Sequence, residues 1–260
     1  MHIEPAEHIK SIQEYYFSVK LAEVARMNAE GKDVISLAVG APDRMPSQET
    51  IDTLCETARR PDVHAYQPYT GIPELRRAYA DWYHKIYGVS LAPDEVLPLI
   101  GSKEGILHIS MTFLNYGDAV LVPNPGYPTY TSVSELLRAR VIQYDLKEDE
   151  NWQPDFEALE KMDLRGVKLM WVNYPNMPTG ANASISLFEK LVAFGKKHNI
   201  LICHDNPYSF ILNDTPLSIL SVPGAKDICI ELNSLSKSHN MSGWRMGMLA
   251  SNAQFVKWVL

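Results

Sequence analysis

The stretch SISLFEKLVAFGKKHNILICHDNPY, residues 184–208, contains the unit from which the fold can be predicted. Residues 184–199 have the spacing of apolar side chains that is typical of an amphipathic helix. Residues 200–203 form a short, wholly apolar run of the kind that makes a buried strand, and the polar cluster DNPY follows at once. A helix followed by a buried strand and a polar turn is typical of an α/β protein.

The same alternation recurs along the 260-residue chain. Short apolar runs rich in β-branched residues occupy residues 33–39, 95–100, 118–123, 139–146, 167–174, 200–205 and 227–233. Helix-like segments lie between most of these runs. The runs are apolar along their whole length, as strands covered on both faces are. We therefore predict a three-layer αβα domain built on a mainly parallel, seven-stranded sheet.

The composition excludes several classes of protein. The chain is 46% hydrophobic and carries a formal net charge of −7, which argues against a nucleic-acid platform with its basic stripe. The sequence has no apolar run of membrane-spanning length, and the N-terminal residues lack the apolar core of a signal peptide. The three cysteines form no CxxC pair and the eight histidines no HExxH pair, so we expect no metal and a reduced, cytoplasmic setting.

Polar or glycine-containing clusters come directly after five of the apolar runs. They are GSKEG (101–105), NPGY (124–127), NYPNMPTG (173–180), DNPY (205–208) and SLSK (234–237). Because loops are generally polar, a single cluster of this kind needs no special explanation. Five clusters, each directly after an apolar run, are less well explained in that way. In open α/β sheets, ligands bind in a crevice at the carboxyl ends of the strands. We therefore expect the five clusters to meet in one crevice.

The residue types in these clusters suit an anionic, aromatic ligand. A carboxylate at Asp205, at the end of a buried strand, is costly unless a cation such as a protonated ring nitrogen meets it. Lys237 follows another buried strand, where desolvation favours a reactive neutral amine, and Arg245 can hold a phosphate with its forked donors. The simpler alternatives are a structural ion pair or helix cap at Asp205 and a surface lysine at Lys237.

Two further clusters add weaker signals. GSKEG would present unsatisfied N–H groups at a helix start, a suitable place for a phosphate. It matches neither the Walker loop nor the full dinucleotide fingerprint, so a nucleotide-binding α/β protein remains only an alternative that leaves Asp205 and Lys237 unexplained. Tyr127 offers a flat face for stacking on a ring, although an aromatic residue there can equally be packing.

Taken together and in order, these motifs resemble the class I/II aminotransferases, which use pyridoxal 5′-phosphate and have the fold called type I. The stretch SLSKSHNMSGWRMG (234–247) is similar to the family's lysine signature, S-x-S-K with an arginine eight residues after the lysine. The resemblance extends over nearly the whole chain. It implies amino transfer between an L-amino acid and a 2-oxo acid, with 2-oxoglutarate as the acceptor, by a ping-pong Schiff-base mechanism.

The resemblance implies roles for individual residues. Lys237 resembles the lysine that holds the cofactor as a Schiff base and shuttles a proton. Asp205 resembles the aspartate that pairs with the pyridinium nitrogen. Tyr208 resembles the tyrosine that hydrogen-bonds the ring's phenolic oxygen, and Tyr127 resembles the aromatic residue that stacks on the ring.

Other positions match the family's phosphate and substrate contacts. Tyr66, in YQPYTGIPELRRA, resembles the tyrosine that reaches the phosphate of the neighbouring subunit, which implies a homodimer. Gly40, in VGAPD, matches a glycine near the substrate carboxylate. The residues that match phosphate ligands are Ser102, Lys103, Glu104, Ser234, Ser236 and Arg245.

The sequence departs from the family pattern in two respects. Where the family reads N-P-T-G, Met177 precedes Pro178, so the ring and substrate contacts of the usual asparagine fall to Asn176, to Asn173, or to Tyr208 alone. The chain is also shorter than the family. We expect residues 1–45 to form an N-terminal arm and small-domain segment, residues 46–260 the large cofactor-binding domain, and most of the small domain, with its carboxylate-binding arginine, to be missing.

Two alternatives to amino transfer remain open. The same lysine and aspartate would serve a C–S lyase, or another enzyme that acts at Cα on this fold. The second alternative is a shortened chain that is not an enzyme and that binds the cofactor weakly or acts only as a dimerisation or regulatory module. The expected partners are therefore an amino acid, a 2-oxo acid and a second copy of the chain, with neither nucleic acid nor membrane.

Overall fold

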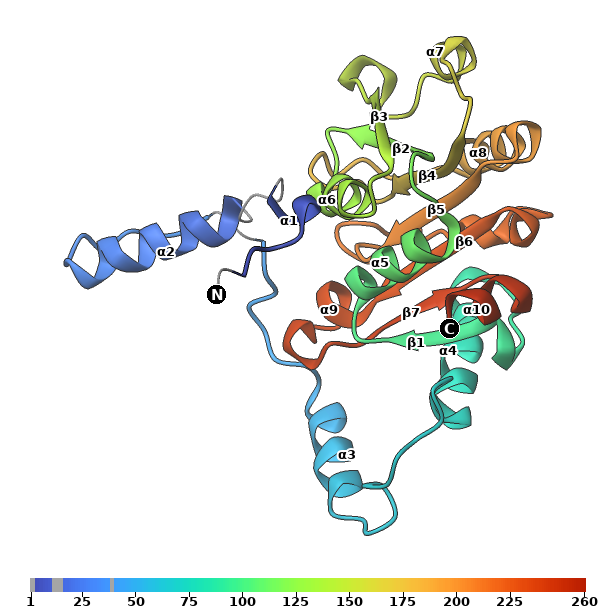
Figure 1. Cartoon of the computed structure of the whole chain (residues 1–260). Helices are drawn as coiled ribbons and strands as arrows, with labels where there is room; N and C mark the ends of the chain where they lie inside the picture. The colour runs from blue at the N-terminus through green and yellow to red at the C-terminus, as the bar shows by residue number, and fades with distance from the viewer. Residues whose placement is uncertain (1–2, 11–15, 38–39) are drawn as a thin grey trace.

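The computed structural model of this protein describes residues 3–10, 16–37 and 40–260 (Figure 1). Its described part is built on a seven-stranded sheet with the strand order β1-β7-β6-β5-β4-β2-β3. The strands are β1 (Val96–Leu99), β2 (Ala119–Asn124), β3 (Arg140–Asp145), β4 (Val167–Asn173), β5 (Leu201–Asn206), β6 (Cys229–Ser234) and β7 (Gly247–Ala250).

The sheet is mainly parallel, as the sequence predicts. Strands β3, β2, β4, β5 and β6 pair in parallel, whereas β7 lies antiparallel between β6 and β1. Because the five parallel strands end at the same edge, the residues that follow them converge there. Strand pairing places Asn173 opposite Asp205 and His204 opposite Glu231.

Helices cover both faces of the sheet, which gives three layers (Figure 1). One buried cluster joins one face of the sheet to α5, α6 and α10, and a second cluster joins the opposite face to α4, α7 and α8. The helices are α1 (Glu7–Lys10), α2 (Tyr16–Ala29), α3 (Gln48–Ala58), α4 (Pro73–Tyr87), α5 (Ser102–Phe113), α6 (Pro128–Leu136), α7 (Phe156–Lys161), α8 (Ile185–His198), α9 (Leu235–Ser238) and α10 (Ala253–Val259).

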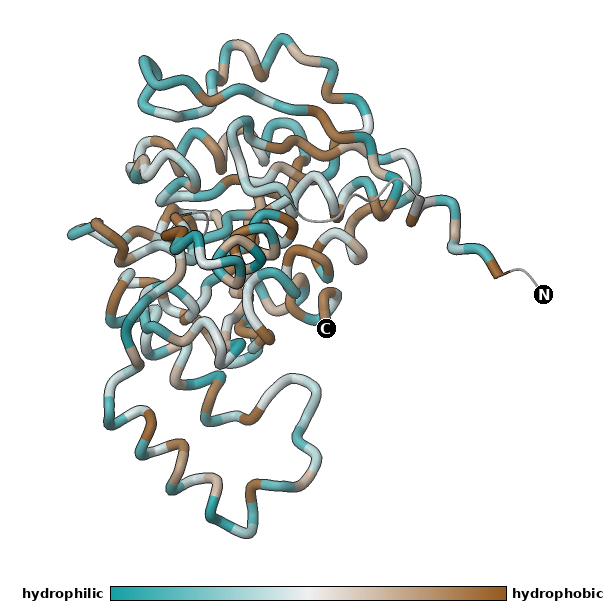
Figure 2. Tube along the Cα trace, turned by 90° about the vertical axis from the view of Figure 1, so that its left-hand side faces the viewer, coloured by the Kyte–Doolittle hydropathy of each residue, from teal (hydrophilic) through white to brown (hydrophobic). Residues whose placement is uncertain are grey.

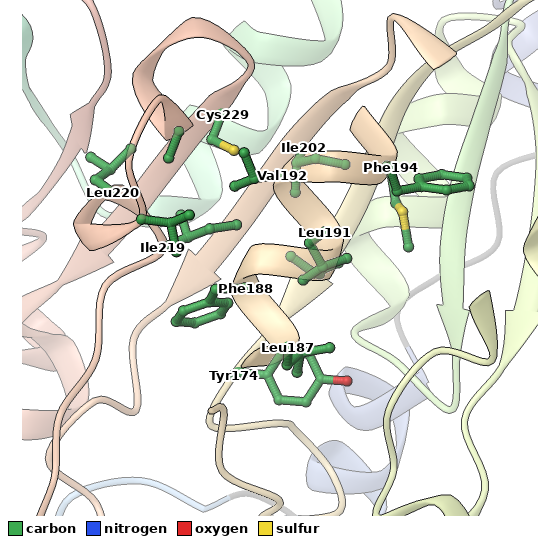
Figure 3. Packing of buried hydrophobic residues seen from close by; sticks show 14 of the residues in the cluster. Tyr174, Leu187, Phe188, Leu191, Val192, Phe194, Ile202, Ile219, Leu220 and Cys229 are labelled. Atoms are coloured by element: carbon green, nitrogen blue, oxygen red, sulfur yellow. The ribbon is translucent and has the colours of Figure 1, made fainter. Parts of the chain in front are cut away.

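Helix α8 shows how the local sequence fixes these elements. The Ser184 hydroxyl accepts a hydrogen bond from the Leu187 N–H and caps the first turn, and Asn199 ends the helix in the left-handed conformation. The apolar side chains of the helix pack against β5, with Phe188 and Leu191 fully buried (Figure 3). Burying one such side chain contributes about 1.5–3 kcal/mol.

The prediction of a strand at residues 33–39 is wrong over residues 33–37. These residues form no strand, and Ile35 and Leu37 are 85% and 92% exposed. Residues 38–39 lie outside the described part. The seventh strand is instead β7, which the sequence analysis missed because its four residues are too few to show a pattern. Its place between β6 and β1, the latter far earlier in the chain, depends on the tertiary structure.

The N-terminal segments contribute little to the core. Helices α2 and α3 bury none of their described residues, and the segment that carries α3 lies away from the sheet in both views (Figure 1 and Figure 2). Close packing against the sheet begins with α4, where Tyr79 and Tyr83 are buried. The predicted domain boundary at residue 46 stays a prediction. Within the described residues, no helix combines the length and apolar character needed to cross a bilayer.

Candidate active site

A cavity of about 710 Å³ lies at the carboxyl edge of the parallel strands. Asn173 reaches it from the end of β4, Asp205 from β5 and Ser234 from β6. The first turns of α5 and α6 contribute Ser102 and Pro128. The other lining residues come mainly from the N-terminal segment, from the loops after β2, β4 and β5, and from the segment after β6. The polar clusters therefore meet in one crevice, as expected.

Asp205 lies at the base of this cavity and is only 3% exposed. Its Oδ2 accepts a 2.9 Å hydrogen bond from the Tyr130 hydroxyl. Its Oδ1 is buried and has no hydrogen-bond partner among the described residues. Burial raises the pKa of the carboxyl group to about 6, although the hydrogen bond from Tyr130 opposes that shift. A buried carboxylate with one unpartnered oxygen is a site for a cationic or N–H donor group.

Tyr130 is a site residue that the sequence analysis missed. Its ring is fully buried and stacks on Trp171 of β4, with the ring centroids 5.0 Å apart and the planes 4° from parallel. Burial raises the pKa of its phenol well above the usual value, so the hydroxyl remains a donor to Asp205. Its position three residues after Tyr127, the residue that precedes α6, was the available signal, and the two rings are in contact.

Lys237 lies in α9, directly after β6, and lines the same cavity as Asp205. Its side chain is partly buried, and burial lowers the pKa of the amine. The amino group donates a 2.9 Å hydrogen bond to the Gly40 carbonyl oxygen. Nearly two hundred residues of sequence separate these partners, so the fold alone brings the N-terminal segment to this amine. A desolvated amine is suited to attack a carbonyl carbon.

The N-terminus of α5 forms the cationic end of the cavity. Gly101 precedes the helix with a φ of +97°, and Ser102 and Lys103 line the cavity from the first turn. Arg245 lines the cavity beside them, and its guanidinium donates to the Ile100 carbonyl at 3.2 Å and to the Ser236 hydroxyl at 3.4 Å. A Cβ at position 101 would collide with that guanidinium. Backbone N–H groups and a forked cation together suit a phosphate.

The structure brings most of the predicted site residues together. Those that line the cavity share a position at a strand end, at a helix start or in the segment after β6. They are Gly40, Ser102, Lys103, Tyr127, Asp205, Tyr208, Ser234, Ser236, Lys237 and Arg245.

Three predicted site residues do not line this cavity. Glu104 turns its carboxylate back to accept the Ile100 N–H at 2.6 Å, which caps the start of α5. Asn176 is buried inside its own loop, where its amide oxygen accepts from the Thr179 hydroxyl at 2.8 Å and its amide nitrogen donates to a backbone carbonyl. Tyr66 is fully exposed, and its predicted contact with a neighbouring subunit stays a prediction.

Asn173, rather than Asn176, presents its side chain at the cavity. Its Nδ2 donates to the Asp205 carbonyl at 2.8 Å, and its Oδ1 accepts the Met177 N–H at 2.7 Å. The side chain thus joins the end of β4 to β5 and to the following loop. Asn173 and Tyr208 both line the cavity and Asn176 does not, and which of them contacts the ring stays a prediction.

The donor set fits the cofactor that the resemblance implies. The unpartnered Oδ1 of Asp205 suits a protonated ring nitrogen, the α5 start with Arg245 suits a phosphate, and Lys237 lies in the wall of the same cavity. No group of three or more histidine, cysteine, aspartate or glutamate side chains suited to a metal ion occurs within the described residues. The chemistry of the site is therefore that of an organic phosphate with a basic ring nitrogen.

Comparison with known proteins points in the same direction. A Dehalococcoides mccartyi protein named LL-diaminopimelate aminotransferase is 46% identical over 254 residues, which cover 96% of this chain and 66% of that protein. A protein of the same name from Aquifex aeolicus is 40% identical over 256 residues, which cover 97% of this chain and 66% of that protein. The chain thus spans 66% of the length of these relatives.

Solved structures show the same fold. The apo structure of BacF from Bacillus subtilis has a TM-score of 0.93 and 38% identity, covering 100% of this chain and 66% of that one. A Thermus thermophilus aspartate aminotransferase has a TM-score of 0.91 at 24% identity, covering 99% and 67%, and supports the type I fold alone. The family described as aminotransferase class I and II matches residues 32–260, and this chain belongs to that family.

Proposed function

We propose that this protein is a pyridoxal 5′-phosphate-dependent aminotransferase that moves an amino group from LL-diaminopimelate to 2-oxoglutarate. The observation that carries the proposal is the presence, in one cavity, of a partly buried lysine and a buried carboxylate with an unpartnered oxygen. The relatives named LL-diaminopimelate aminotransferase, 40–46% identical, support the choice of substrate.

The cofactor, when bound, supplies an electron sink for the negative charge that develops at the substrate Cα. Asp205 has the task of keeping a proton on the ring nitrogen, because its buried carboxylate is stabilised most by a positively charged partner. Tyr130 holds that carboxylate in place by its 2.9 Å hydrogen bond. Asp205 and Tyr130 together therefore present a charged carboxylate in a fixed orientation to the ring nitrogen.

Lys237 both holds the cofactor and carries a proton. Because burial lowers the pKa of its amine, a larger fraction of the group is neutral near pH 7 than for an exposed lysine. A neutral amine can first attack a carbonyl carbon and later take a proton from the substrate Cα. The Gly40 carbonyl, 2.9 Å from Nζ, orients the amine at the cavity wall.

The remaining cavity residues bind and orient the ligand. The start of α5, Ser234, Ser236 and Arg245 would hold the phosphate, and Tyr127 and Tyr208 would contact the ring. Gly40 would approach the substrate carboxylate. We also propose that the protein acts as a homodimer, in which the exposed Tyr66 reaches the phosphate of the partner subunit.

An assay of both products tests this function. Purified protein with pyridoxal 5′-phosphate, LL-diaminopimelate and 2-oxoglutarate should form glutamate, and omission of 2-oxoglutarate should limit the reaction to a single turnover. The Lys237→Ala variant is the matched control and should form none. Steady formation of pyruvate and ammonia from a sulfur amino acid, without any 2-oxo acid, would instead assign a C–S lyase.

A further inference from the structure

A buried polar network lies on the face of the sheet opposite the cavity. His204 and Glu231 are cross-strand neighbours on β5 and β6, and both side chains are 0% exposed. Their Nδ1 and Oε2 atoms are 2.7 Å apart. The proposed function uses neither residue, although a fully buried histidine–carboxylate pair is costly unless its other polar atoms are satisfied.

Donors from α4 and from the 3₁₀ turn Ile219–Ser221 satisfy the Glu231 carboxylate. Its Oε1 accepts from the Tyr83 hydroxyl at 2.7 Å and from the Ser218 hydroxyl at 2.9 Å. Its Oε2 accepts the Ile219 N–H at 3.0 Å as well as facing His204. Three elements therefore fix the carboxylate, and the carboxylate in turn fixes the imidazole.

The other ring nitrogen of His204 points to the loop after β4. Nε2 lies 2.9 Å from the Tyr174 carbonyl oxygen. A carbonyl oxygen can only accept, so Nε2 carries a proton and donates it. The ring also packs edge-on against Phe188 of α8, with the ring centroids 4.9 Å apart, which restricts its rotation. Phe188, Tyr174 and Ile219 belong to one buried cluster on this side of the sheet (Figure 3).

The loop that begins at Tyr174 is therefore held from both faces of the sheet. On the cavity face, Asn173 bonds the Asp205 carbonyl and the Met177 N–H. On the opposite face, His204 bonds the Tyr174 carbonyl. Met177 and Pro178, the next residues of the loop, form part of the cavity wall.

We propose that His204, anchored on Glu231, is a positioning residue that fixes the loop of residues 174–178 and thereby shapes the cofactor cavity from the far side of the sheet. His204 touches neither the cavity nor a reacting atom. It acts through the backbone of Tyr174, so its loss should loosen one wall of the cavity and leave Asp205 and Lys237 in place. The part of this inference that concerns the cofactor rests on the function proposed above.

The test compares three variants with the wild-type protein. His204→Phe removes both hydrogen bonds and keeps an aromatic ring, with His204→Leu as the substitute should the first not fold. His204→Gln keeps an amide N–H that can donate to the Tyr174 carbonyl. Tyr83→Phe is the matched control, because it removes one donor from Glu231 without altering the contact between His204 and Tyr174.

Two measurements are made on each variant. The first is hydrogen exchange of the Asn176 and Gly180 amides, which join the loop to the residues directly after it by bonds to the Ala181 and Asn176 carbonyls at 2.8 and 2.7 Å. The second is the dissociation constant for pyridoxal 5′-phosphate from an absorbance titration. His204→Phe should speed exchange at these two amides and raise the dissociation constant at least about tenfold, equivalent to about 1.4 kcal/mol. His204→Gln should restore most of the affinity, and Tyr83→Phe should change neither loop exchange nor affinity.

The inference fails if His204→Phe leaves the exchange of the two amides and the affinity unchanged, or if Tyr83→Phe has an equal effect. A wild-type protein that binds no pyridoxal 5′-phosphate would refute the proposed function. The exchange measurement would still decide whether His204 fixes the loop, because it needs no cofactor. The two failures are therefore distinguishable.

Discussion

The Tyr130 hydroxyl donates a 2.9 Å hydrogen bond to Oδ2 of Asp205, and the opposite carboxylate oxygen remains unpartnered among the described residues. One carboxylate oxygen is thus fixed by the protein, and the other is buried without a partner in a residue that lines the cavity. Because the Tyr130 ring is stacked on Trp171, this donor has little freedom to move. The arrangement orients Asp205 before any ligand binds.

Replacement of Asp205 by asparagine should stabilise the cofactor-free protein at neutral pH. The folded-state pKa of about 6 lies above the usual aspartate value of 3.8, so between these pH values the folded state binds more protons than the unfolded state. The free energy of unfolding then falls as the pH rises from about 4 to 6. The full loss of about 3 kcal/mol persists at higher pH. Urea unfolding should show Asp205→Asn to be more stable than wild type at pH 8 and equal to it at pH 4. A constant difference at all pH values would contradict this origin.

The Tyr130→Phe substitution should move that transition to higher pH. Loss of the donor removes a contact that lowers the pKa of Asp205, and a hydrogen bond to a charged group is worth about 1.5–3 kcal/mol. The pH range over which the free energy of unfolding decreases should therefore lie about one unit higher than in the wild-type protein. Tyr144→Phe is the control, because that buried hydroxyl donates at 2.6 Å to the Trp171 carbonyl instead. It should lower stability without shifting the profile.

Lys237 should be the site of covalent attachment of pyridoxal 5′-phosphate. Its lowered pKa favours the reactive neutral amine. After borohydride reduction, peptide mass spectrometry should find the adduct on Lys237 and none in Lys237→Ala. The Lys103→Ala variant, which changes another cavity lysine, should retain the adduct. An adduct found mainly on Lys103 would overturn the assignment.

A methyl group at position 101 should weaken phosphate binding. The Cβ of Gly101→Ala would collide with the Arg245 guanidinium and displace it from the start of α5. We expect a loss of about tenfold in affinity for pyridoxal 5′-phosphate, or about 1.4 kcal/mol. Gly117→Ala is the matched control, since Gly117 also has a positive φ, +83°, but no atom lies within 4 Å of an added Cβ. Gly117→Ala should lower the free energy of unfolding by about 1 kcal/mol and leave the affinity for the cofactor unchanged. If both variants lowered the affinity equally, backbone strain alone would be responsible.

Much of the fold could be predicted because it follows from local pattern. The runs that became β2, β4 and β5 are mainly apolar, and helices such as α8 begin and end at residues that cap them. The predicted strand at 33–39 had the right composition but lies away from the sheet, with Leu37 almost fully exposed. Composition alone cannot reveal whether a run finds a surface on which to pack.

The candidate site divides in the same way. Asp205 and Lys237 could be predicted because each directly follows a buried strand, and the carboxyl ends of parallel strands share one edge. The position of Asn173, and not Asn176, at the cavity could not be predicted, because it depends on how the loop after β4 turns. Asn173 and Asn176 are of the same residue type and lie close together in the sequence, so the sequence does not distinguish them.

The sequence by itself determined the α/β alternation, the mainly parallel sheet and the family, because these depend on residue order and on short-range spacing. Only the tertiary structure decided that Tyr130 serves Asp205, that Gly40 meets Lys237, and that His204 and Glu231 hold the Tyr174 loop from the far face. The physical reason is that a hydrogen bond forms over about 3 Å between residues far apart in the sequence. Their proximity is set by strand order, which the packing of the whole domain determines.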